Sequence, residues 1–149
     1  MAETTTHATR LLGIDYGTKR IGLSLGDPLG IIATPLETIA NDTKAVGYIL
    51  ALTARERVAA LVVGMPFNLK GEKSRKAMEV EEFVDRLRRA APCEVILWDE
   101  RFTSTMARQT LRSMGTKKKD RQKKATVDAM AAAIILQSFL NSTKHSKAS

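Results

Sequence analysis

The stretch Leu11-Leu-Gly-Ile-Asp-Tyr-Gly-Thr-Lys-Arg-Ile-Gly-Leu-Ser-Leu-Gly-Asp27 decides the fold class of this chain. It consists of two short apolar runs around a turn that contains Gly17, a pattern typical of a β-hairpin. Apolar residues alternate with small ones from Ile21 to Leu25, which suits a strand with one face against helices. The chain is therefore expected to begin with an antiparallel pair, followed by a third short strand at 31–34 that ends at Pro35.

After the hairpin, segments with helical and strand periodicity alternate along the chain. A sheet that starts with hairpin strands and continues with strand–helix crossovers has antiparallel strands first and parallel strands after them. We expect an α/β fold with a mixed five-stranded sheet flanked by helices. The expected elements are a helix capped by Asn41-Asp42-Thr43, a strand at 61–63, a helix at 77–87, a strand at 95–98, a short helix from Thr103 or Ser104 to Gly115, and a helix at 126–140.

Length and composition favour one ordinary globular domain. The chain has 149 residues, of which 44% are hydrophobic and 27% are charged. We expect a domain over 11–140 between disordered tails at 1–10 and 141–149. There is no apolar run of the roughly 20 residues that span a bilayer and no apolar signal region at the N-terminus, so we expect no membrane association and a cytoplasmic location. The single cysteine, Cys93, cannot form an intramolecular disulfide, and a zinc site is not expected.

The formal net charge of +8 is unevenly distributed. Nearly all of the excess lies in the segment 108–124, where Asp120 is the one acid. A basic block of this kind attracts a polyanion and releases counterions when it meets phosphates, although it can also be a solvated loop. Its basic residues are Arg108, Arg112, Lys117, Lys118, Lys119, Arg121, Lys123 and Lys124.

Acidic residues at two strand ends and in the last helix are candidates for chemistry. Asp15 ends the first strand, where open sheets place ligands, and either Asp99 or Glu100 ends a later one. Neighbours on a strand point to opposite faces, so only one of that pair can face Asp15, and spacing does not say which. Asp128 lies in an otherwise apolar helical stretch. Three carboxylates suit Mg²⁺ or Mn²⁺, which can activate water at a phosphodiester.

Each acid also has a purely structural interpretation. Asp15 could accept backbone N–H groups in its turn, and Asp99 or Glu100 could form a salt bridge with Arg101. Asp128 could be compensated by a lysine of the preceding basic run. Clustered acids repel one another, however, and a cluster without a cation would raise its own pKa values.

Five segments, in order along the chain, resemble the YqgF family, whose members are described as Holliday-junction-resolvase-like proteins or pre-16S rRNA nucleases. The resemblance covers almost everything between Leu11 and Leu140. It implies a ribonuclease H-like fold, metal-dependent hydrolysis of RNA phosphodiesters and a role in maturing small-subunit ribosomal RNA. The matching segments are Gly13–Gly22, Gly26–Gly30 with Thr34–Glu37, Val63–Asn68, Asp99–Thr103 and Val127–Ala131.

The resemblance also assigns residues. It implies that Asp15, Glu100 and Asp128 are the catalytic and metal-binding acids, which settles the choice between Asp99 and Glu100 by similarity alone. Gly17 and Thr18 would shape the turn beside Asp15. The implied phosphate contacts are Lys19, Arg20, Asn68 and Arg101. The charge of the basic run separately predicts backbone contacts by Lys117, Lys118, Lys119, Arg121, Lys123 and Lys124.

One departure concerns the wider superfamily, in which many nucleases carry an acid after the first strand that follows the hairpin. Here that strand ends Gly64-Met65-Pro66 without a carboxylate. The number and geometry of metal ions therefore stay open at this stage.

Three alternative functions remain open from the sequence. The nuclease could act on branched DNA, as a junction resolvase that cuts two strands from a symmetric dimer. The chain could bind ribosomal RNA without cutting it. The residues Asp15 to Thr18 also resemble the phosphate-binding hairpin of actin-like and sugar-kinase phosphotransferases, but 149 residues leave no room for their second lobe.

Overall fold

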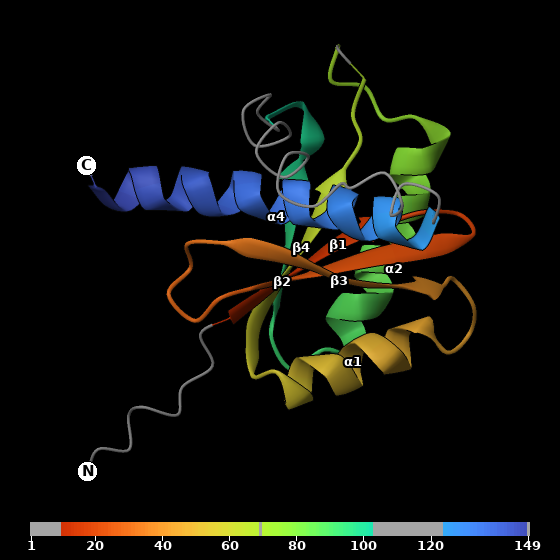
Figure 1. Cartoon of the computed structure of the whole chain (residues 1–149). Helices are drawn as coiled ribbons and strands as arrows, with labels where there is room; N and C mark the ends of the chain where they lie inside the picture. Colours follow the sequence, from red (N-terminus) through yellow and green to blue (C-terminus); the bar gives the residue numbers. More distant parts are fainter. Residues whose placement is uncertain (1–9, 69, 103–123, 149) are drawn as a thin grey trace.

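Five strands form one mixed sheet in the order β3-β2-β1-β4-β5 (Figure 1). The computed structural model describes residues 10–68, 70–102 and 124–148. β1, β2 and β3 are antiparallel neighbours, whereas β4 runs parallel to β1 and β5 parallel to β4, as predicted. The strands are β1 Arg10–Tyr16, β2 Arg20–Gly26, β3 Ala33–Ala40, β4 Val58–Met65 and β5 Glu94–Asp99.

Helices cover both faces of this sheet. Figure 1 shows α1 (Ala45–Arg55) and α2 (Arg75–Ala90) on one face and α4 (Lys124–Ala148) across the other. A single 3-10 turn, η2 (Glu100–Phe102), follows β5 directly. α4 continues beyond Leu140, where the apolar pattern of the sequence ends, to Ala148. None of the helices in the described part of the chain is long and apolar enough to cross a membrane.

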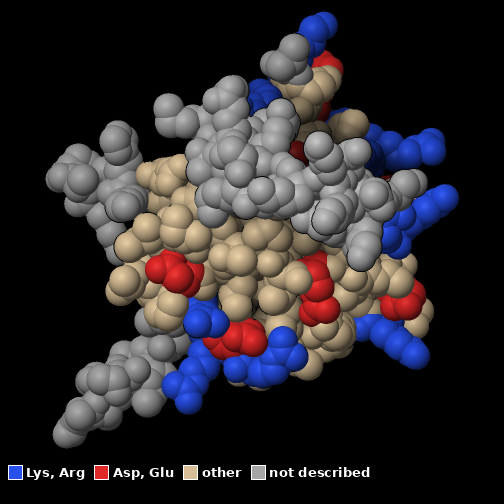
Figure 2. Space-filling view, in the orientation of Figure 1, with Lys and Arg blue, Asp and Glu red and all other residues tan. Residues whose placement is uncertain are grey.

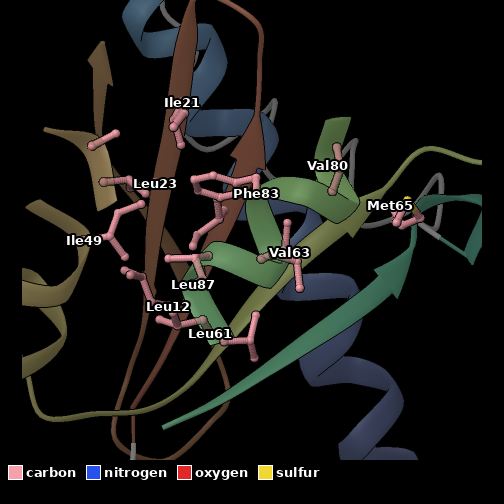
Figure 3. Close-up of a cluster of buried hydrophobic side chains, with 14 of the residues drawn as sticks. Leu12, Ile21, Leu23, Ile49, Leu61, Val63, Met65, Val80, Phe83 and Leu87 are labelled. Carbon is pink, nitrogen blue, oxygen red and sulfur yellow. The ribbon is translucent and has the colours of Figure 1, made fainter. Parts of the chain in front are cut away.

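Strand alternation divides the core into two layers. Leu12, Ile14, Ile21 and Leu23 point toward α1 and α2, where they pack around Phe83 (Figure 3). On the opposite face, three hairpin residues that meet the α4 backbone are small, namely Gly13, Gly22 and Ser24. This arrangement follows from the period-two geometry of strands, and it buries the apolar side of the amphipathic α2 against the sheet.

Small residues let the backbone of α4 lie directly on β1 and β2. A Cβ atom at Gly22 would lie 2.0 Å from the Asp128 carbonyl oxygen, and one at Gly13 would lie 2.8 Å from the Ala132 carbonyl oxygen. The Ser24 hydroxyl donates to the same Ala132 oxygen over 2.9 Å. The glycines of the hairpin thus set the distance between helix and sheet, and hence the height of Asp128 above the strands.

Two local predictions were wrong. β3 does not end at Pro35 but continues to Ala40, because β3 is an edge strand and its register with β2 shifts beside Ser24, which accommodates a residue without an N–H group. The side chains of Asn41-Asp42-Thr43 do not cap α1, whose N-cap is Lys44 with no side-chain cap bond. The expected helix from 103 or 104 to 115 lies outside the described residues.

Candidate active site

Asp15 lies at the carboxyl end of β1, opposite Gly22 of β2. Strand alternation places its side chain on the same face as Gly13, the face that α4 covers. Burial raises the pKa of the Asp15 carboxyl from 3.8 to about 6, and the negative charges of Glu100 and Asp128 add to this effect. The ammonium group of Lys76, in the first turn of α2, acts in the opposite direction. Asp15 therefore shares an electrostatic environment with both of the other predicted acids.

The structure places Asp99 and Glu100 on different faces of the sheet. Ile96 and Trp98 pack with α4, whereas Val95 and Leu97 pack with the opposite core layer. Glu100 follows β5 in η2, and its side chain lies on the α4 side, because a Cβ atom at Gly64 would meet both Ile135 of α4, at 2.6 Å, and Glu100 Oε2, at 2.7 Å. Asp99 belongs to the other side, where its carboxylate accepts a hydrogen bond from Arg101 Nη2 over 2.6 Å, and this bond lowers the pKa of Asp99. The structure therefore brings Glu100, and not Asp99, to the face that carries Asp15.

Gly64 accounts for the missing acid on β4. A Cβ atom at this position would lie 2.7 Å from the Glu100 Oε2 atom and 3.1 Å from its Cγ atom. The Glu100 side chain thus occupies the space that a side chain on β4 would need. At the end of β4, the position of the absent acid is therefore taken by the carboxylate of Glu100, which follows β5.

Asp128 is compensated by Arg20 at the start of β2. Arg20 Nε donates to Asp128 Oδ2 over 2.8 Å. Both side chains are partly exposed, so the pair is accessible to solvent and to a phosphate. The positive charge beside Asp128 therefore comes from the hairpin, where Arg20 is engaged with this carboxylate.

The β1–β2 turn beside Asp15 is braced from a distant segment. The Asn41 side-chain amide donates to the Gly17 carbonyl over 2.8 Å and to the Thr18 carbonyl over 3.3 Å. A Cβ atom at Gly17 would lie 2.4 Å from the Arg20 carbonyl oxygen, so the tight turn requires glycine. Lys19 is exposed at this turn, where a phosphate could reach it.

Asn68 is engaged within its own loop. Its Oδ1 atom accepts hydrogen bonds from the N–H groups of Lys70 and Glu72, and its amide donates to the Glu72 carboxylate. Arg101 lies next to this loop, with its guanidinium carbon 5.3 Å from the centroid of the Phe67 ring. Asn68 therefore stabilises the conformation of its own loop. Arg101 contacts both the Asp99 carboxylate and the Phe67 ring.

Charged side chains of both signs are interspersed around an uncharged centre on the face shown in Figure 2. The predicted phosphate-binding residues Lys117, Lys118, Lys119, Arg121 and Lys123 lie outside the described residues, and the side chain of Lys124 at the start of α4 is also outside them. The three acids from distant parts of the sequence are therefore the best-defined feature of this region.

Residues 9–142 match the family model described as RuvX, Holliday junction resolvase. The chain belongs to the RuvX family. It is 43% identical over 135 residues to the "Putative pre-16S rRNA nuclease" of Sulfurihydrogenibium sp., with 89% of this chain and 90% of that protein covered. It is 44% identical over 137 residues to the protein of the same name from Amoebophilus asiaticus, with coverages of 91% and 96%.

Solved structures with the same fold include junction resolvases at low identity. The Thermus thermophilus RuvC structure in complex with a Holliday junction substrate aligns with a TM-score of 0.56 and 18% identity, covering 87% of this chain and 91% of that one. The fowlpox virus resolvase in complex with junction DNA aligns with a TM-score of 0.54 and 14% identity, with coverages of 90% and 98%. These matches confirm the predicted ribonuclease H-like fold. The family model confirms the predicted family.

Several residues around this RuvX-family site were not identified from the sequence. Lys76 was missed because nothing in its local pattern distinguishes it from other surface lysines. The roles of Gly22 and Gly64 are contacts with Asp128 and Glu100, which are remote in sequence. Asn41 was interpreted as a helix cap because asparagine is common in that role, whereas it braces the hairpin turn.

Proposed function

We propose that this chain is a metal-dependent nuclease that hydrolyses RNA phosphodiesters in the maturation of pre-16S ribosomal RNA in the bacterial cytoplasm. Its catalytic and metal-binding carboxylates are Asp15, Glu100 and Asp128. The observation that carries the proposal is that these acids, from three distant segments, come together on the face that α4 covers: Asp15 pairs opposite Gly22, Asp128 lies over Gly22, and Glu100 lies over Gly64. Burial and the charges of the two other acids accordingly raise the pKa of Asp15. The names of the RuvX-family relatives support the substrate.

The donors fit a hard divalent cation in kind, because all three are carboxylates. Within the described residues, no group of three acids, histidines or cysteines is spaced to hold one ion. Mg²⁺ commonly takes one or two protein carboxylates and completes its shell with water and phosphate oxygens. Asp15 and Glu100 therefore fit an ion that binds together with the substrate phosphate, with Asp128 beside them. Bound Mg²⁺ or Mn²⁺ would supply an activated water and stabilise the leaving oxygen.

The protein residues prepare this chemistry in three ways. Ionised Asp15 and Glu100 would provide negative oxygen ligands in a partly buried place, where their mutual repulsion would favour the binding of a cation. Arg20 orients Asp128 and keeps a positive charge near the position of the phosphate. Lys19 and Arg101, at the two neighbouring loops, would contact the phosphates that flank the cleaved bond.

The decisive experiment compares Glu100→Gln with Asp99→Asn on a pre-16S rRNA fragment and on a four-way DNA junction, each with Mg²⁺, Mn²⁺ or EDTA. Glu100→Gln should reduce cleavage at least about tenfold because it removes a charged ligand, whereas Asp99→Asn should retain most activity. Gel analysis of the products measures both rates. Cleavage of the junction alone would favour a resolvase, and tight RNA binding without cleavage would favour a non-catalytic RNA-binding factor.

The basic run is proposed to dock the nucleic acid backbone. Replacing Lys117, Lys118 and Lys119 with glutamine should weaken binding to all sequences and reduce the slope of log affinity against log salt by roughly two to three. Arg55→Gln with Arg89→Gln is the control, because these residues end α1 and α2 at the sheet edge opposite the carboxylates. A salt slope that is the same in the triple variant and the wild type would make the run a solvated loop.

A further inference from the structure

Phe102 is an exposed aromatic residue that follows the proposed catalytic acid Glu100 closely along the chain. It ends η2, two residues after Glu100, and two residues of a 3-10 helix advance the chain by only about 4 Å. Its exposed fraction of 63% is the highest of any aromatic residue in the described part of the chain. Most phenylalanines are buried, so an exposed one beside a functional site calls for a physical explanation.

Phe102 contacts β5 through its ring and α4 through its backbone carbonyl. It lies edge-on to Trp98 of β5, with ring centroids 5.8 Å apart, and Trp98 lies edge-on to Phe139 of α4 at 5.6 Å. The Ser138 hydroxyl of α4 donates to the Phe102 carbonyl over 3.1 Å. Contacts along one edge leave the rest of the ring accessible, while the backbone bond restrains its position.

We propose that Phe102 is a stacking platform for an unpaired base of the nucleic acid that lies over the proposed carboxylate site. The inference rests on the proposed nuclease function and adds a substrate class, namely RNA that is single-stranded or locally unpaired beside the cleaved phosphate. Aromatic side chains stack on free base faces in a largely sequence-independent way. A base in a continuous duplex has no free face to offer.

Binding in EDTA tests the platform without depending on cleavage. Trp98 is the single tryptophan of the chain, and it contacts Phe102, so its fluorescence should change when single-stranded RNA binds. Phe102→Ala should weaken binding of a single-stranded RNA about tenfold and leave binding of a fully paired duplex unchanged. Phe102→Tyr should bind like the wild type, whereas Phe102→Leu should bind like Phe102→Ala, because leucine keeps apolar bulk but cannot stack.

The control is Leu29→Ala, which removes another exposed apolar side chain in the β2–β3 loop, at the opposite end of β2. It should leave RNA binding unchanged. Wild-type affinity in Phe102→Leu, or equal losses for single strand and duplex in Phe102→Ala, would overturn the proposal and would point to a protein partner or a packing role. If Phe102→Ala fails to fold, the tyrosine and leucine variants still decide.

Different results would refute the proposed nuclease function and the proposed stacking role of Phe102. RNA binding that depends on Phe102 without any metal-dependent cleavage would refute the nuclease and leave the platform. Metal-dependent cleavage together with unchanged RNA binding in the Phe102 variants would support the nuclease and refute the stacking platform.

Discussion

Asp15→Asn is expected to abolish cleavage and, at the same time, to stabilise the metal-free protein at neutral pH. Loss of a charged ligand at the proposed metal site should reduce the cleavage rate on the order of 100-fold or more. The stabilisation arises because the wild type keeps a repelled, half-buried carboxylate whose pKa is raised from 3.8 to about 6. Asparagine has nearly the same shape and no charge, so it removes the repulsion.

The raised pKa of Asp15 predicts how the stability of the wild type changes with pH. The folded protein holds the Asp15 proton more tightly than the unfolded chain does, so wild-type stability falls as the pH rises from 3.8 to about 6. Above about pH 6 the free energy of unfolding does not fall further on account of Asp15. Because the side chain is partly exposed, the total decrease is limited to about 1–3 kcal/mol. Thermal denaturation of both proteins in EDTA should therefore give equal melting temperatures near pH 3.5. Toward pH 7.5 the melting temperature of Asp15→Asn should be the higher of the two.

Asp99→Asn is the matched control for this experiment. The pKa of Asp99 is lowered by its hydrogen bonds with Arg101, so neutralising Asp99 should not stabilise the protein at neutral pH. Adding Mg²⁺ should raise the melting temperature of the wild type and have less effect on Asp15→Asn, because a ligand that binds only the folded state stabilises it. A stability difference that does not vary with pH would contradict the raised pKa.

Gly22→Ala is expected to have the largest effect on stability. The added Cβ atom would lie 2.0 Å from the Asp128 carbonyl oxygen and 2.4 Å from its carbonyl carbon. These are backbone atoms of α4, so the overlap cannot be relieved by a side-chain rotation, and the helix must move away from the sheet. We expect a loss of at least about 3 kcal/mol in the free energy of unfolding, because overpacking against backbone costs more than typical core strain.

The same substitution should also reduce cleavage, because Gly22 lies opposite Asp15 and sets the distance to Asp128. Gly47→Ala in α1 is the control, since its Cβ atom would meet nothing within 4 Å. It should raise stability by roughly 0.5–1 kcal/mol, as expected for alanine in place of glycine in a helix. Urea denaturation measures both variants, and equal stability of Gly22→Ala and the wild type would show that α4 does not depend on this contact.

The order and type of the elements could be predicted from local patterns. The alternation from Ile21 to Leu25 and the helical spacing from Ala77 to Leu87 both reflect burial on one face, which the sequence records directly. The errors occurred where a residue type has several uses. Pro35 was interpreted as a strand end because proline lacks an N–H donor, but an edge strand tolerates it.

The candidate site was less predictable, because it depends on contacts between remote segments. Asp15 could be proposed from its strand end, whereas its raised pKa depends on Glu100 and Asp128. Asn68 is a good hydrogen-bonding residue in any loop, and only the structure shows that its polar atoms are satisfied by Lys70 and Glu72.

By itself, the sequence determined that a glycine-rich hairpin begins a mixed sheet and that acids follow two of its strands. It also established that only one of Asp99 and Glu100 can share a face with Asp15, because side chains alternate along a strand. Which of the two does so was decided by tertiary structure, since the Glu100 side chain lies over Gly64 beside Ile135 of α4, whereas Asp99 bonds Arg101. The physical reason is that alternation is a local property of the backbone, whereas the choice of face depends on which helix covers it.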